Sequence, residues 1–218
     1  NEPDATGRVF RAAAAALLIL WPVVLGKVPV PADAVSGVDP WRSEAVPELG
    51  DGPIWNPLIT DALWQGVPDA ITAHRMWSEG LPLWEPDLAC GMPALARARM
   101  FSNPGFPLIS RVTGPVRALG WTAWLQLTAA LWGAYLLARQ LGVVPAAAGV
   151  AAVAFGFNLY LVVWLPLTFV LGSLVWLPML FFCFERALAT RRPGWVACGA
   201  AVFAVQILEG QVSTVLLG

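Results

Sequence analysis

The stretch ALGWTAWLQLTAALWGAYLLA, residues 118–138, contains no charged side chain and favours one class of fold. As an α-helix, a segment of this length crosses a bilayer hydrocarbon core of ~30 Å. The whole chain of 218 residues has the same character, with 58% hydrophobic residues, 12% charged residues and a mean hydropathy of +0.66. An ordinary soluble domain carries about 25% charged residues. The sequence therefore predicts an all-α protein whose solvent is largely a membrane.

Further apolar segments flank this one on both sides. They cover residues 12–26, 146–165, 167–184 and 194–208, and a sixth is expected to begin at Val212. We therefore expect a polytopic transmembrane helical protein with about five to six spans. In the first segment, Pro22 and the lack of a small-x-small cleavage site favour a retained anchor over a secretory signal peptide. The chain has no initial Met and ends in an apolar run, so we interpret it as the N-terminal part of a longer protein.

The arginines of the short connections predict the orientation. Cytoplasmic loops are enriched in Lys and Arg, and this bias is informative in short loops. Arg8 and Arg11 precede the first span, and Arg139 lies between the second and third spans. Between the fourth and fifth spans lie Arg186, Arg191 and Arg192. A cytoplasmic N-terminus places all of them in the cytoplasm. Residues 1–30 are then a cytoplasmic stub and the first transmembrane helix, 31–117 a large first extracytoplasmic loop, and 118–218 helices two to five and the start of six.

The extracytoplasmic loop is expected to be folded. It holds ten of the 14 acidic residues, and it is too rich in Trp, Leu and Pro to be disordered. Within it, PDAITAHRMWSEG, residues 68–80, predicts a short amphipathic helix that begins at Pro68 and stops at Gly80. One face of this helix carries Ala70, Ile71, His74 and Trp77. Residues 81–107 have Pro or Gly every few positions and predict an irregular backbone.

Three polar side chains recur every four residues in ITDALWQGVPD, residues 59–69. They are Asp61, Gln65 and Asp69, and in a helix neighbours at this spacing share a face. Each also has an ordinary structural interpretation. Asp61 can cap a helix or lie in a solvated turn, Gln65 can anchor the loop, and Asp69 suits the positive end of the helix that follows.

The composition argues against several classes of function. A net charge of -1 without a basic block argues against nucleic-acid binding. The sequence has no Gly-rich phosphate loop, no G-x-S-x-G motif and no His pair at metal spacing. The single histidine, His74, is expected to be a packed or interfacial side chain, and the odd number of cysteines implies no disulfide framework.

Four motifs, in order, resemble the YfhO-like bacterial membrane proteins of the GT-C glycosyltransferase superfamily. They are ITDALWQGVPDAI at 59–71, EGLPLWEPDLACGMPALA at 79–96, FSNPGFPL at 101–108 and YLLARQLG at 135–142. The resemblance runs from about Ile59 to the end of the chain. Two positions depart from the family pattern. Glu85 replaces the Asn of L-W-N-P, and Glu-Gly-Gln at 209–211 stands where the family has G-H-P-Q.

The resemblance implies a GT-C type hexosyltransferase embedded in the bacterial plasma membrane. Such an enzyme moves a sugar from a polyprenyl phosphate carrier to a cell-envelope glycan or lipid acceptor on the outer face. Asp61 matches the family's Asp and is the predicted catalytic base, beside Trp64. The predicted substrate-binding residues are Gln65, Asp69, Arg97, Arg99, Glu209 and Gln211. The cofactor is not assigned, and the sequence does not indicate a divalent metal.

Other interpretations compete with these roles. Arg97, Arg99 and Arg111 are candidates for the donor phosphate, and equally for membrane lipid headgroups. Glu209 is either functional or a residue that emerges into water at the outer end of the fifth span. For the whole protein, the alternative is a non-catalytic membrane protein that binds or moves a lipid-linked glycan. A transporter is disfavoured, because no charged residue interrupts the middle of spans two to four.

Overall fold

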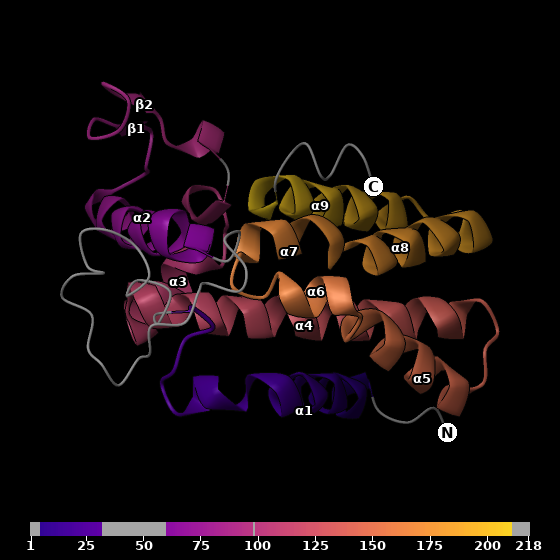
Figure 1. The fold of residues 1–218 in the computed structure, drawn as a ribbon. Helices are drawn as coiled ribbons and strands as arrows, with labels where there is room; N and C mark the ends of the chain where they lie inside the picture. Colours follow the sequence, from indigo (N-terminus) through magenta and orange to yellow (C-terminus); the bar gives the residue numbers. More distant parts are fainter. Residues whose placement is uncertain (1–4, 32–59, 98, 211–218) are drawn as a thin grey trace.

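The computed structural model describes residues 5–31, 60–97 and 99–210, and this part of the chain is all-α apart from one small hairpin (Figure 1). Helix α4, Pro115–Gln140, is the axis on which α1, α2, α3, α5, α7 and α8 pack. Its 26 residues extend over ~39 Å. The helix begins three residues earlier than the predicted span, because Gly114 adopts a φ of 83° and Pro115 suits a first helical position.

The first predicted span is confirmed as a helix, α1, Ala5–Val24, which is kinked. Leu20 leaves the helical region, with φ -98° and ψ 20°, two residues before Pro22. A proline inside a helix removes a backbone donor and clashes with the preceding turn, which explains the kink. The helix packs on the middle of α4 through small and aliphatic side chains: Ala16, Leu20, Val23, Ala123, Leu127 and Ala130.

The prediction of one continuous helix over residues 146–165 is wrong. The structure has α5, Pro145–Gly156, and a separate short α6, Leu159–Val163. Asn158 makes the break, because its side-chain oxygen accepts a hydrogen bond from the backbone N of Leu161 at 3.0 Å. Its Nδ2 donates to the carbonyl of Phe155 at 2.6 Å. A side chain that caps a helix in this way starts a new one.

The fourth and fifth predicted segments form α7, Thr168–Leu174, α8, Leu177–Thr190, and α9, Pro193–Glu209. Together α7 and α8 make a helical run of 23 residues that contains an 18-residue window with a mean hydropathy of 1.7. Within the described residues, this run alone is both long and apolar enough to cross a membrane. The α8–α9 turn follows Arg191, whose left-handed φ of 52° ends α8 and lets α9 return beside it (Figure 1).

Residues 60–113 form a cap over one end of α4 (Figure 1). Its elements are η5 (Ala62–Gly66), α2 (Val67–Glu79), β1 (Trp84–Glu85), β2 (Met92–Pro93), η6 (Leu95–Arg97), η7 (Arg99–Phe101) and α3 (Phe106–Thr113). The two strands pair antiparallel, with Trp84 opposite Pro93. The predicted helix over 68–80 is confirmed as α2. The irregular backbone is confirmed up to residue 105, whereas α3 and the hairpin were not predicted.

The cap rests on α4 through small side chains of α2. Ala70 and Ala73 are fully buried in a cluster with Phe101, Phe106 and Leu119. The predicted apolar face of α2 is therefore rotated, because Ile71 remains 49% exposed while Ala73 is buried. The residues between 32 and 59, and the sixth span expected from Val212, lie outside the described part of the chain.

Helix α8 approaches α4 so closely that Gly133 leaves no room for a side chain. A Cβ at this position would lie 3.0 Å from the backbone N of Met179 and 3.3 Å from its Cβ. We expect Gly133→Leu to lower the free energy of unfolding by about 1–3 kcal/mol, the usual effect of overpacking. Thermal unfolding of the purified protein measures this effect. Gly194→Leu is the control, because a Cβ at Gly194 meets no atom within 4 Å, and equal loss in both variants would contradict the packing described here.

Candidate functional site

A buried ion-pair network holds the cap together. Asp69 and Glu85 are only 6% and 5% exposed. Arg97 lies between them, donating from Nη2 to Asp69 Oδ1 at 2.6 Å and from Nη1 to Glu85 Oε2. Arg99 Nη1 donates to Asp69 Oδ2 at 3.1 Å and to Gln65 Oε1 at 3.0 Å. Two positive and two negative charges therefore meet in one site, and each buried carboxylate has a charged partner.

Local structure explains how the members of this network are positioned. Gln65 and Asp69 lie one turn apart on the segment from η5 into α2, so both reach Arg99, as their spacing predicted. Asp69 is also in the first turn of α2, where a carboxylate is stabilised by the helix dipole. Four of the six predicted substrate-binding residues, Gln65, Asp69, Arg97 and Arg99, are thus brought together.

Glu85 is the member of the network that the sequence analysis missed. In the sequence, Glu85 stands out only as a departure from the L-W-N-P motif. In the structure it lies on β1, and the turn at residues 86–91 brings the chain back so that Arg97 reaches it. The available signal was an acid just before the turn at residues 86–91 and an arginine, in η6, soon after the chain returns from it.

The network also fastens the cap to the helices below it. The guanidinium of Arg99 lies over the ring of Phe169 on α7, 4.2 Å from its centroid. Arg97 stacks in the same way on Phe101, at 4.7 Å. On the neighbouring side, Ser102 Oγ donates to the carbonyl of Leu208 on α9 at 2.7 Å. Cation–π contacts of this kind are strongest where the cation is shielded from water, as it is here.

Glu209 lies apart from the ion-pair network, at the end of α9 nearest the cap. It is only 8% exposed, so the interpretation that it emerges into water is wrong. Its Oε2 accepts hydrogen bonds from Gln126 Nε2 at 3.1 Å and from Trp176 Nε1 at 2.9 Å. One turn earlier, Gln206 donates to the carbonyl of Ser173. These contacts join α4, α7, the α7–α8 connection at Trp176 and α9. The sequence analysis did not predict them.

Asp61 is half-buried and directly precedes η5. Its side chain makes no capping hydrogen bond, which removes the helix-cap interpretation. Within the described residues, no hydrogen bond or ion pair is found for this carboxylate. The next residue, Ala62, is fully buried beside Leu167, Phe169 and Val170, so the backbone at Asp61 is held in place.

An apolar cavity of about 580 Å³ lies between the end of α1 and α6, and we call it the α1–α6 groove. Leu20, Val28 and Val30 form one wall, and Val162 and Leu165 form the other. Val30 also packs against the cluster that contains Ala62.

Among the described residues, Lys27 is the one charged residue that lines the α1–α6 groove, and it is the only lysine in the sequence. It is exposed and has no acidic partner in the described part of the chain. Among the described residues, the groove therefore combines an apolar interior with one cation that has no acidic partner. Asp61 is the chain neighbour of Ala62, which belongs to the cluster that Val30 contacts.

The other candidates have ordinary structural roles or lie outside the described residues. His74 Nδ1 is 3.1 Å from Ser110 Oγ, so the prediction of a packed side chain is confirmed. Arg111 donates to the carbonyl of Trp77 at 3.0 Å. Over residues 5–31, 60–97 and 99–210, no three His, Cys, Asp or Glu side chains group as metal ligands would. Gln211 is outside this part of the chain.

In comparisons with protein-family models, curated proteins and solved structures, nothing matches this chain. The resemblance to the YfhO-like proteins, and the activity that it implies, therefore stay predictions.

Substitution of Arg97 tests how much the ion-pair network contributes to the free energy of unfolding. Arg97→Met leaves Glu85 buried without its charged partner, and breaking a buried ion pair costs about 3–5 kcal/mol. We expect a loss of this size in the free energy of unfolding, measured by denaturant titration. Adding Glu85→Gln should recover part of the loss, because Asp69 keeps Arg99 as its partner.

The matched control for this variant is the exposed ion pair of Arg75 and Asp87, whose side chains are 53% and 64% accessible. Arg75→Met should leave the free energy of unfolding almost unchanged, because exposed pairs contribute little. If the two arginine variants lose equal stability, the buried network does not hold the cap.

Proposed function

We propose that this protein is a membrane-embedded glycosyltransferase that moves a sugar from a polyprenyl phosphate carrier to a cell-envelope glycan or lipid, with Asp61 as its base. One observation carries the proposal. Asp61 has no partner in the described residues, and the next residue, Ala62, belongs to a cluster against which Val30 packs. Val30 also lines an apolar groove whose one charged lining residue, among those described, is a lysine. The apolar groove suits a lipid tail, the lysine suits a phosphate, and the carboxylate suits an acceptor hydroxyl that must lose its proton.

The distribution of side chains supports a membrane location. Large apolar side chains are exposed on the outer faces of α5, α8 and α9: Val150, Phe181, Phe184, Leu188, Val196, Phe203 and Leu208. Polar side chains are instead buried between the helices: Gln126, Ser173, Gln206 and Glu209. A bundle in water has the opposite pattern, whereas a bundle in lipid turns its polar groups inward.

The arrangement of the two ends supports the orientation. Figure 1 shows the cap at one end of α4 and the α4–α5 and α8–α9 turns at the other. Those turns follow or contain Arg139, Arg191 and Arg192. Because arginines favour the cytoplasmic side, the cap is placed on the extracytoplasmic side of a bacterial plasma membrane.

The α1–α6 groove is the proposed site for the donor. Its apolar walls suit the isoprenoid tail, and Lys27 supplies a charge-assisted hydrogen bond to the phosphate. Arg97 and Arg99 are less suited to that role than the sequence predicted, because both are already paired with carboxylates. We therefore assign the phosphate contact to Lys27.

The ion-pair network then has a positioning role. Gln65 and Asp69 belong to the same short segment as Asp61, and Arg99 ties both of them to Phe169 on α7. This tether fixes the segment that carries Asp61 relative to α7, which in the chain follows the segment 162–166 that lines the groove. A base must be held within hydrogen-bond reach of the proton that it removes, so the network serves the reaction without touching the substrate.

The reaction follows from these positions. The acceptor oxygen attacks the anomeric carbon and forms the new C–O bond, while Asp61 takes the hydroxyl proton. The bond from the anomeric carbon to the phosphate oxygen breaks, and its electron pair leaves with the phosphate. Lys27 stabilises the charge that develops on the leaving group. One base suffices, and the configuration at the anomeric carbon inverts.

The decisive test is Asp61→Asn in purified protein reconstituted in lipid, with radiolabelled polyprenyl phosphate sugars as donors. We expect transfer, or slow donor hydrolysis, to fall about 100-fold to 10,000-fold, the usual contribution of a general base. Asp87→Asn is the control, because Asp87 is an exposed acid of the same cap. Saturable donor binding without turnover in either form would replace the enzyme with a protein that binds or moves a lipid-linked glycan.

The role of Lys27 is tested separately by Lys27→Gln. Loss of the charged contact should raise the KM for the donor about tenfold, because a hydrogen bond to a charged group contributes roughly 1.5 kcal/mol or more. Steady-state kinetics with varied donor measures the change. Arg75→Gln in the cap is the control, and an unchanged KM in Lys27→Gln would move the phosphate site elsewhere.

A further inference from the structure

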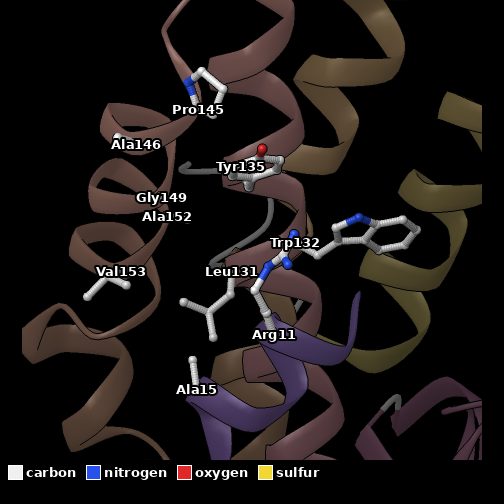
Figure 2. A pocket seen from close by; sticks show the side chains of 10 residues that line it. All are labelled: Arg11, Ala15, Leu131, Trp132, Tyr135, Pro145, Ala146, Gly149, Ala152 and Val153. Carbon is white, nitrogen blue, oxygen red and sulfur yellow. The ribbon is translucent and has the colours of Figure 1, made fainter. Parts of the chain in front are cut away.

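A second cavity lies in the half of α4 that is farther from the cap, among α1, α4 and α5 (Figure 2). Its volume is about 500 Å³, within the range of sites that hold small ligands. Ala15, Leu131, Ala152 and Val153 make its walls apolar. The cavity is distinct from the α1–α6 groove, because the two have no lining residue in common.

Two polar groups reach this cavity. Figure 2 shows the Arg11 side chain extending from α1 across to α4, where Tyr135 presents its hydroxyl. In the described part of the chain, no ion pair is found for the Arg11 guanidinium. An apolar chamber with one guanidinium and one hydroxyl is complementary to an amphiphile with an anionic headgroup.

We propose that this cavity binds an anionic phospholipid. One acyl chain occupies the space between α4 and α5, and the headgroup phosphate accepts hydrogen bonds from Arg11 and Tyr135. The orientation supports the choice, because this end of the bundle carries the arginine-containing turns assigned to the cytoplasmic side, and basic pockets between helices on that side suit anionic headgroups. The site rests on the proposed membrane location but on neither Asp61 nor the transfer reaction.

Gly149 gives a way to close the cavity without disturbing its walls. It lines the cavity from α5, and a Cβ placed on it meets no atom within 4 Å. Gly149→Leu therefore fills space that the acyl chain would occupy. The substitution also replaces a poor helix former with a good one, so α5 is expected to stay folded.

Trp132 lines the cavity and reports on its occupant. The protein is reconstituted in unlabelled phosphatidylcholine to which a minor fraction of a brominated lipid is added. This lipid is either brominated phosphatidylglycerol or brominated phosphatidylcholine, and its brominated acyl chains quench tryptophan fluorescence on contact. The difference between wild type and Trp132→Phe isolates the signal of this side chain. We expect brominated phosphatidylglycerol to bind about five-fold more tightly than brominated phosphatidylcholine, which is the effect of one cation near an anionic headgroup.

Two variants test separately the charge of Arg11 and the occupation of the cavity by an acyl chain. Arg11→Gln should remove the preference for phosphatidylglycerol, whereas Arg192→Gln, which changes an exposed arginine of the α8–α9 turn, should keep it. Gly149→Leu should lower quenching of Trp132 by both lipids, and Gly194→Leu should not. Circular dichroism confirms that each variant is folded.

Several outcomes would overturn the proposal. Equal quenching by the two lipids in wild type would remove the headgroup contact, as would a preference that survives Arg11→Gln. Unchanged quenching in Gly149→Leu would show that no acyl chain enters the cavity. Displacement of brominated phosphatidylglycerol by equimolar unlabelled polyprenyl phosphate would make the occupant the donor lipid instead. Loss of sugar transfer in Asp61→Asn bears on none of these outcomes, so the two proposals fail separately.

Discussion

Arg97 lies between two buried carboxylates, and the position of the cap depends on this contact. Asp69 comes from α2 and Glu85 from the hairpin, so one guanidinium joins two segments of the cap. Arg99 extends the network to Gln65 and to the ring of Phe169. Each charge is compensated at close range, which is what allows the two carboxylates to be buried. The segment that carries Asp61 is held over the helices as a consequence.

The two cavities lie in different parts of the helix bundle, and each is lined by a different cation. The α1–α6 groove lies where α1 is kinked by Pro22, and the kink separates the end of α1 from α6. The second cavity opens where α5 leaves α4, next to small residues such as Gly149 that leave space unfilled. Each cavity is apolar with a single cation, Lys27 in one and Arg11 in the other. The proposed donor and the proposed structural lipid therefore occupy opposite ends of the bundle.

Much of the fold could be predicted from local pattern. The apolar segments around 118–138 and 194–208 are helices, and Pro68 and Gly80 bound α2 as their preferences require. The break at Asn158 was missed, because a single capping residue inside an apolar run does not change the hydropathy that predicted a continuous span. The face of α2 was misjudged at Ile71 for a related reason. The close packing of α2 against the cap core requires small alanines, whereas hydrophobicity alone predicts that the larger Ile71 is buried.

The sequence by itself determined the helical class, the apolar segments, and the spacing that lets Gln65 and Asp69 act on one partner, because each of these depends on residues within a few turns of one another. Only the tertiary structure decided which charges are paired. Asp69 meets Arg97 and Arg99 across about thirty positions, and Glu209 meets Gln126 across more than eighty. Partners at such separations are chosen by packing and by the free energy of burying charge, and neither can be read from local spacing.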